Sequence, residues 1–130
     1  MNTGWSRSAI IGLMGTFFHP MRIIGPDGRE VELDALVDTG ASFSSVPGQI
    51  LRDLGVTPVR RVRLRLANGE KHIQELGRVR AEINGDEEPT LVIFGEAGSP
   101  PAIGAYTLEG LALGVDPVEG RLVPMEGWRA

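Results

Sequence analysis

Short runs in which apolar and polar residues alternate dominate the chain from Thr16 onward. A period of two predicts strands with one buried face. The unbroken apolar run Leu91-Val92-Ile93-Phe94 instead suits a strand that is buried on both faces. We expect strands over residues 17–24, 31–37, 62–66, 79–83, 91–94, 102–104 and 121–124.

Glycine and proline place the turns between these segments. Gly25-Pro26-Asp27-Gly28 predicts a hairpin, and Asn68-Gly69 and Asn84-Gly85 each predict a tight two-residue hairpin turn. Pro47 can begin a short helix with an apolar stripe of Ile50, Leu51 and Leu54 and with Gly55 as its end, and residues 107–111 suit a second helical turn. The pattern favours a mostly β fold, a small closed or sandwich-like β barrel with one or two short helices.

Length bounds the domain organisation. The 130 residues suffice for one hydrophobic core and are too few for two catalytic lobes. We expect an N-terminal extension over residues 1–13 and a single domain over residues 14–130. The apolar stretch over residues 9–18 is too short to span a bilayer, and no clear signal-peptide cleavage site follows it.

Charge and cysteine content remove several classes of function. The net charge of -4 gives no global attraction to nucleic acid or to anionic membranes, so we expect neither as a partner. The chain has no cysteine, which excludes disulfides, thiolate nucleophiles and cysteine-ligated zinc. A cytoplasmic location is expected.

The segment Val37-Asp38-Thr39-Gly40 places an acid where an apolar strand ends, followed by a hydroxyl residue and a glycine. Gly40 allows the backbone to turn sharply and its amide N–H groups to approach the carboxylate, while Thr39 can hydrogen-bond to its surroundings. Asp38 is therefore a candidate for acid–base chemistry. The same tripeptide also suits a simple polar turn between two elements.

With Ala41 and Ser42, this segment resembles the active-site signature of retropepsin-like aspartic peptidases, including their bacterial relatives. Further features agree in order. The hairpin over residues 66–73 falls where that family carries the flap that covers the substrate, and Leu76-Gly77-Arg78-Val79 is similar to its returning arm. Ala102-Ile103-Gly104, followed by Leu108 and Leu111, resembles the family's apolar-apolar-glycine strand and the short helix after it.

The resemblance implies a small closed β barrel of the retropepsin type that needs no cofactor and no metal. It implies that Gly104 allows close backbone approach beside the catalytic loop. Ser42 stands where the retroviral enzymes usually carry an acid, as in bacterial members. The resemblance assigns catalysis to Asp38 and loop support to Thr39, Gly40, Ala41 and Ser42. It assigns the substrate-binding flap to Ala67, Asn68, Gly69 and Glu70, with Asn68 and Gly69 at its tip, and the strand beside the loop to Ile103 and Gly104.

Aspartic peptidases need two carboxylates that share a proton and hold the attacking water, and the chain has one suitable acid. Asp116 comes closest to a second, but Pro117 follows it in place of a hydroxyl residue. An isologous homodimer would place Asp38 opposite its own copy. By the same resemblance, Thr39 would meet its symmetry mate, and residues 121–123 could add an intermolecular strand. The predicted function is that of a homodimeric endopeptidase acting on peptides or proteins.

Other functions fit the residues less well. A latent or inactive dimerisation or peptide-binding module of the same fold remains the main alternative. Aspartyl-phosphate chemistry wants a second acid where Gly40 stands, and a serine hydrolase reading of Ser42 lacks the second glycine of a nucleophile elbow.

The remaining chemistry-bearing residues point to ordinary structural roles. His19 and His72 lack ligand-spaced partners for a metal. The cations Arg60, Arg61, Arg63 and Arg65 alternate largely with apolar residues, which favours a solvated strand face over an anion site. Trp5 and Trp128 lie near the termini and receive no catalytic role.

Overall fold

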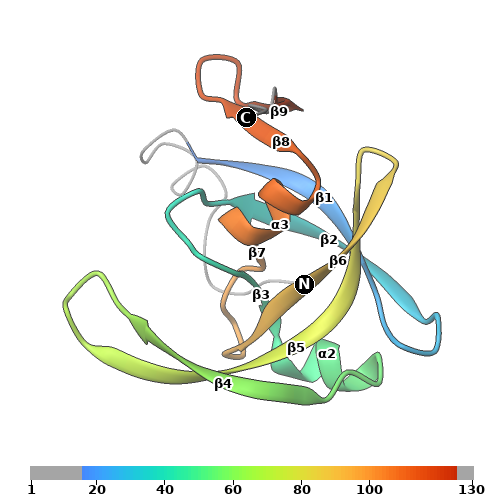
Figure 1. Cartoon of the computed structure of the whole chain (residues 1–130), viewed down its shortest axis with the longest axis vertical. Coiled ribbons are helices and arrows are strands. Elements are labelled where there is room, and N and C mark those ends of the chain that lie inside the picture. Colours follow the sequence, from blue (N-terminus) through green and yellow to red (C-terminus); the bar gives the residue numbers. More distant parts are fainter. Residues whose placement is uncertain (1–15, 126–130) are drawn as a thin grey trace, which may run out of the picture.

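The computed structural model describes residues 16–125, which form nine strands and two short helices (Figure 1). Every strand expected from the sequence is present, although several are longer than expected. The elements are β1 (Phe17–Ile24), β2 (Glu30–Val37), β3 (Ser44–Pro47), α2 (Gly48–Asp53), β4 (Pro58–Arg65), β5 (Lys71–Ile83), β6 (Asp86–Gly95), β7 (Ala102–Ile103), α3 (Ala105–Gly110), β8 (Leu113–Asp116) and β9 (Arg121–Pro124).

Seven strands form one sheet in the order β1-β2-β7-β3-β6-β5-β4. The sheet closes on itself because β5 also pairs with β1, where Ile23 lies opposite Ala81. In Figure 1 the sheet accordingly curls round, with β4 outside the closed ring as an edge strand. The short strands β8 and β9 form a separate antiparallel pair. The expectation of a mostly β, closed barrel with two short helices is confirmed.

The barrel encloses a continuous apolar core. Alternate residues of the strands point inward, and the core side chains include Met21, Ile23, Val46, Val92 and Ile103, all fully buried. Leu51 and Leu54 of the α2 region add to this core, as the predicted helical stripe requires. Each such side chain contributes about 2 kcal/mol by leaving water, so the core is what holds the ring of strands closed.

The two hairpin turns that contain Asn-Gly differ in detail. Asn84 and Gly85 both have positive φ, of 55° and 88°, so the predicted two-residue turn is correct. The prediction for Asn68-Gly69 is wrong, because Arg65 pairs with Lys71 and a longer loop lies between them. Of this pair only Gly69 is left-handed, and the Asn68 side chain accepts the Glu70 N–H instead.

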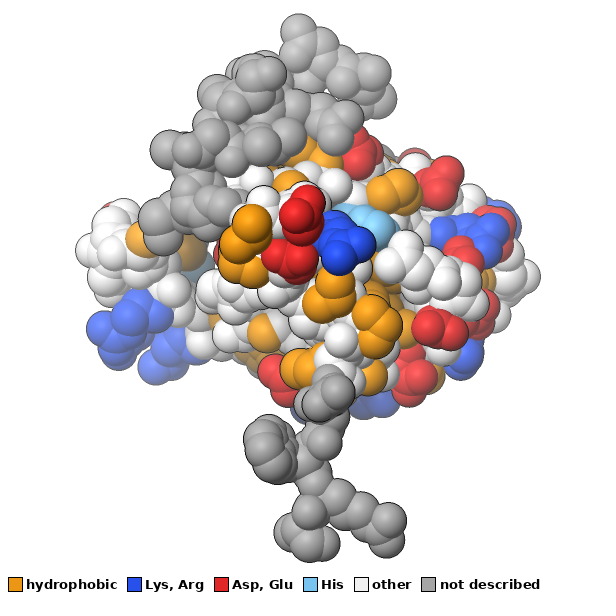
Figure 2. Space-filling model, turned by 90° about the horizontal axis from the view of Figure 1, so that it is seen from above, with side chains coloured by type: hydrophobic (Ala, Val, Ile, Leu, Met, Phe, Trp, Pro, Cys, Tyr) orange, Lys and Arg blue, Asp and Glu red, His pale blue; other side chains and the backbone are white. Residues whose placement is uncertain are grey.

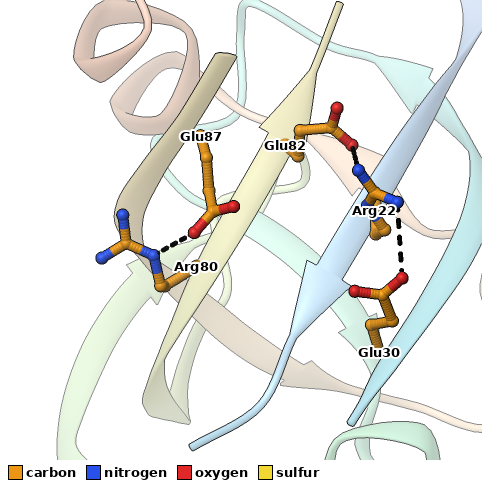
Figure 3. A network of polar contacts seen from close by, with 5 residues as sticks. All are labelled: Arg22, Glu30, Arg80, Glu82 and Glu87. Atoms are coloured by element: carbon orange, nitrogen blue, oxygen red, sulfur yellow. Dashed lines mark hydrogen bonds and ion pairs between the residues drawn. The ribbon is translucent and has the colours of Figure 1, made fainter. Parts of the chain in front are cut away.

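Ion pairs follow the seam where the sheet closes (Figure 3). Arg22 of β1 pairs with Glu82 of β5 and with Glu30 of β2, and Arg80 of β5 pairs with Glu87 of β6. Desolvation lowers the pKa of the Arg22 guanidinium, but the charges of Glu82 and Glu30 outweigh it and the pKa is raised above its ordinary value. These side chains are partly exposed, so the pairs fix strand register more than they add stability.

The elements differ from the sequence-based expectations in several places. Strands β4, β5 and β6 begin at Pro58, Lys71 and Asp86, earlier than the expected residues 62, 79 and 91. Strands β3 and β8 were not predicted, because each has only four residues with no clean alternation. Pro47 ends β3 and caps α2 rather than occupying the first helical position, and Gly104 caps α3 rather than ending a strand. The expected boundary between residues 13 and 14, like Trp5 and Trp128, lies outside the described residues. No helix within residues 16–125 is long and apolar enough to cross a membrane.

Candidate active site

Asp38 follows β2 directly, and its backbone is hydrogen-bonded to β7. The backbone N–H of Asp38 donates to the carbonyl of Ile103 at 2.9 Å, and the N–H of Leu36 donates to the carbonyl of Pro101 at 2.8 Å. Strand β7 therefore lies parallel to β2, and it is inserted between β2 and β3. This arrangement fixes the point at which β2 ends, and it places the half-buried Asp38 side chain at the end of that strand.

The loop after Asp38 is braced from within and by the first turn of α3. The N–H of Gly40 donates to Asp38 Oδ1 at 3.0 Å, and the N–H of Ala41 donates to the Asp38 carbonyl at 3.1 Å. The N–H groups of Ala105 and Tyr106 donate to the carbonyls of Ala41 and Ser42. These are helix N-terminal donors that have no partner within the helix, so helix and loop satisfy one another.

Gly104 lies against the backbone of the same loop. A Cβ at this position would overlap the Phe43 carbonyl and come within 2.9 Å of the Ser44 nitrogen. The N–H of Gly104 donates to Ser44 Oγ at 3.0 Å. The inference that glycine is needed here for close backbone approach agrees with this geometry.

A buried cluster of hydroxyl groups lies beneath the loop. Thr107 Oγ1 lies 2.6 Å from Ser44 Oγ and 2.8 Å from Thr90 Oγ1, and all three side chains are buried. Because Ser44 accepts the Gly104 N–H, its own proton is available for Thr107. Sequence reasoning gave none of the three hydroxyls this role. For Thr90 the available signal was a polar residue placed directly before the apolar run over residues 91–94.

A cavity of about 650 Å³ separates the Asp38 loop from the β4–β5 hairpin. We call this the hairpin cavity. The ring of Phe43 borders it and packs against Tyr106, with ring centroids 5.9 Å apart. Its walls are formed by Asp38, Gly40, Ala41, Ser42 and Phe43 of the loop, by Arg63, Leu64, Arg65, Leu66 and Ala67 of the hairpin, and by Ile93 of β6.

A second cavity, of about 290 Å³, lies on the other side of the Asp38 loop. Thr39, Asp38 and Gly40 border it together with Val115 and Pro117 of the β8–β9 hairpin. Figure 2 looks onto this end of the molecule, where hydrophobic side chains lie exposed among charged ones. The Asp38 loop thus borders both cavities, the hairpin cavity beside the β4–β5 hairpin and the smaller cavity beside the β8–β9 hairpin.

The structure brings most of the sequence-predicted site residues together. Asp38, Gly40, Ala41, Ser42 and Ala67 border one cavity, while Ile103 and Gly104 lie behind the loop. Thr39 is exposed and borders the smaller cavity. The remaining residues predicted for the hairpin tip, Asn68, Gly69 and Glu70, are exposed and do not border either cavity.

The histidines and the other candidate acid have their own partners. His19 Nε2 lies 3.0 Å from Asn84 Oδ1, and His72 Nε2 lies 3.1 Å from Glu70 Oε2. The carboxylate of Asp116 accepts the N–H groups of Val118 and Glu119, both at 3.1 Å. Among the described residues no group of three or more acidic or histidine side chains is placed to hold a metal ion.

Solved structures with a similar fold include retroviral proteases and a retroviral protease-like domain. The EIAV protease in complex with the inhibitor HBY-793 has a TM-score of 0.54 and 20% sequence identity, with 76% of this chain and 90% of that chain covered. The Simian Foamy Virus (mac) protease has a TM-score of 0.52 and 17% identity, over 72% of this chain and 93% of that one.

The retroviral protease-like domain of Ddi1 from Leishmania major has a TM-score of 0.52 and 23% identity, over 82% of this chain and 86% of that one. These likenesses establish the fold. No curated protein sequence matches the chain. The family model for aspartyl proteases matches residues 20–94, a stretch that includes Asp38, its loop and the β4–β5 hairpin. The chain therefore belongs to the aspartyl protease family, with a retropepsin-like fold.

Proposed function

We propose that the chain is an aspartic endopeptidase, in which two Asp38 carboxylates of a homodimer activate the water that hydrolyses a peptide bond. The observation that carries this proposal is the position of Asp38. Its carboxylate is oriented by the Gly40 N–H, its backbone is fixed by Ile103, and it borders a cavity under the β4–β5 hairpin.

A second copy of the chain would supply the second acid. Asp38 is the only acidic residue among those that border the two cavities in the described part of the chain. Asp116 is engaged by the backbone of its own turn, and it lies 3.6 Å from Arg121. An isologous dimer about the Asp38 loop would place two carboxylates together, where they cannot both ionise and so share one proton.

The shared proton defines the chemistry. The ionised carboxylate accepts a proton from water, whose oxygen attacks the peptide carbonyl carbon, while the protonated carboxyl donates its proton to the carbonyl oxygen. The tetrahedral intermediate then collapses, the C–N bond breaks and the amide nitrogen leaves with a proton returned by the dyad. No metal or cofactor is needed for this sequence.

The dimer contact would include the exposed Thr39 and the neighbouring β8–β9 hairpin. Strand β9 pairs with β8 in its own chain, so an intermolecular strand over residues 121–123 would have to use the opposite edge of β9. Val118, at the tip of that hairpin, is 88% exposed. An exposed apolar side chain beside a site that lacks its second acid is consistent with burial in a dimer.

The β4–β5 hairpin would cover the substrate. An extended peptide in the hairpin cavity would run between the Asp38 loop and the wall formed by Leu64 to Ala67. The exposed tip residues Asn68 and Gly69 extend beyond this wall, where they could meet the hairpin of the second copy. The enclosed space would exclude water other than the attacking molecule.

The test compares wild type with Asp38→Asn on a diverse peptide library, with cleavage read by mass spectrometry over a series of protein concentrations. We expect wild type to cleave with an activity per chain that rises with dimer formation, and Asp38→Asn to lose cleavage. The substitution is nearly isosteric but cannot transfer the proton. Asp86→Asn, the same change at the exposed first residue of β6, serves as the control and should cleave as wild type does.

Circular dichroism and dimer mass must match among the three proteins. Wild-type turnover by a folded, dimeric Asp38→Asn protein would refute the role of Asp38. Activity that persists in a demonstrated monomer would refute the shared site. A dimer of wild type that binds peptides without cleaving any would support a peptide-binding module instead.

A further inference from the structure

The β4–β5 hairpin carries a set of cations without acidic partners. Outside residues 60–71, and within residues 16–125, Arg22, Arg29, Arg80 and Arg121 each form an ion pair. In the same range Arg52, which lies over the Phe94 ring, and Arg78 do not. No ion pair involves the hairpin cations in this part of the chain. These cations, which we call the hairpin cations, are Arg60, Arg61, Arg63, Arg65 and Lys71.

The arrangement of the hairpin cations is unfavourable for the chain alone. Arg65 lies directly opposite Lys71 in the β4–β5 register, and like charges in opposite positions repel. Arg63 lies opposite Ile73, whose side chain is 64% exposed. Figure 2 shows basic side chains gathered at the left end of the molecule, where the hairpin lies in Figure 1. This end is cationic although the chain has a net charge of -4.

Two of these cations border the hairpin cavity. Arg63 and Arg65 contribute to its wall, as does Leu64 between them. Neighbouring residues of a strand have side chains on opposite faces, and here consecutive residues of β4 border the cavity. The cavity therefore follows the free edge of β4 rather than one face of the hairpin. Strand β4 is the last strand of its sheet, and this edge has no strand partner among the described residues.

The backbone of the same residues faces that free edge. The N–H of Leu66 donates to the Glu70 carbonyl across the hairpin. In an antiparallel pair the hydrogen-bonding direction alternates, so the N–H and C=O groups of Arg65 and Arg63 point away from β5. A peptide lying along this edge could therefore pair with β4 as an added strand.

We infer that Arg63 and Arg65 select peptide substrates that carry acidic side chains at two positions separated by one residue. This inference rests on the proposed peptidase function and adds a substrate class to it. In an added strand, side chains two residues apart lie on the same face. Two carboxylates at that spacing would lie beside the two guanidinium groups, with which they form charge-assisted and often bidentate hydrogen bonds.

Charged residues on an edge strand have another explanation, because they also prevent unwanted pairing with other chains. That protective role and the selective role predict different results. Protection requires positive charge along the strand but no discrimination between glutamate and glutamine in a peptide. Selection requires such discrimination, and it requires that the discrimination depend on the two arginines that border the cavity.

The experiment uses matched peptides that differ only in Glu-x-Glu against Gln-x-Gln. Their binding to the dimeric Asp38→Asn protein is measured by fluorescence anisotropy, and their cleavage by wild type is measured as kcat/KM. We expect roughly a tenfold preference for the Glu peptide, the order of magnitude for two partly solvated charge-assisted contacts, and a smaller preference at high salt. The combined substitution Arg63→Gln and Arg65→Gln should abolish this preference.

Arg61→Gln is the control, because Arg61 lies on the same strand with the same parity, opposite Glu75, and does not border the cavity. It should keep the preference. Equal handling of both peptides by proteins that cleave would overturn the inference and leave the proposed function intact. If nothing is cleaved, the proposed function fails, and discrimination in the binding assay still decides the inference.

Two further outcomes would also overturn it. A preference that Arg61→Gln reduces as much as the cavity substitutions do would assign the effect to the overall charge of the hairpin. Tight binding of a single-stranded oligonucleotide that depends on Arg63 and Arg65, with the two peptides bound alike, would assign the hairpin cations to nucleic acid.

Discussion

Replacing Thr107 by valine tests whether the buried hydroxyl cluster holds the site together. The side chain of Thr107 is 2% exposed, and its hydroxyl contacts both Ser44 and Thr90. Valine has nearly the same shape, so the substitution removes the hydrogen bonds without opening a cavity. Ser44 would keep the N–H of Gly104 as a donor but would lose the acceptor for its own proton.

The magnitude follows from the number of groups left without partners. Two neutral hydrogen bonds contribute about 1 kcal/mol each, and an unsatisfied buried hydroxyl adds about 1 kcal/mol or more. The methyl group that replaces the hydroxyl recovers about 0.8 kcal/mol of apolar burial. We therefore expect Thr107→Val to lower the free energy of unfolding by about 2 kcal/mol. For a domain of this size that corresponds to a fall in Tm of about 8 °C.

The assay is urea unfolding followed by circular dichroism, at one protein concentration so that dimerisation affects every variant equally. Thr57→Val makes the same change at an exposed position and should stay within about 0.5 kcal/mol of wild type. The double variant with Ser44→Ala should cost less than the sum of the single variants, by about 1 kcal/mol, because the two hydroxyls share one bond. A Thr107→Val protein as stable as the Thr57→Val control would refute this account of the cluster.

Two other substitutions test separate parts of the structure. Gly104→Ala should destabilise the fold by about 3 kcal/mol, since its Cβ would overlap the Phe43 carbonyl, and a denaturation midpoint close to that of wild type would contradict this. The N–H of Arg29, followed by its side chain, lowers the pKa of Asp27 below the ordinary 3.8, so the stability gained from the Asp27 charge is present above that pH and is lost as the pH falls through the lowered pKa. Asp27→Asn should therefore lower the urea midpoint at near-neutral pH, and its difference from wild type should shrink in acid; a difference that grows in acid would show the opposite sign.

The candidate site was only partly predictable from the chain. Asp38 could be found because a strand pattern ends at a short local motif, and Gly104 because Ala102-Ile103-Gly104 resembles the apolar-apolar-glycine strand of the family. The hydroxyls of Ser44, Thr90 and Thr107 could not be grouped in this way. They are brought together from β3, β6 and α3, and no local pattern records that these elements meet.

The turns show the same division between local and tertiary causes. Asn-Gly occurs in the β4–β5 and β5–β6 turns, yet Asn84 has a positive φ and Asn68 does not. The dipeptide permits a two-residue turn, but the pairing register decides whether one forms, and register is set by which side chains must face the core. For the two Asn-Gly hairpins, the sequence therefore predicted the existence of the hairpin more reliably than the geometry of its loop.

The sequence by itself determined where most strands lie, that they are half-buried, and which acid ends a strand beside a glycine, because alternation and turn chemistry act between near neighbours. Only the tertiary structure decided that β7 inserts between β2 and β3, that β5 closes the ring on β1, and that the hairpin with Arg63 and Arg65 lies across a cavity from Asp38. Those contacts join residues far apart in the chain, and they depend on how all the strands share one core rather than on any single segment.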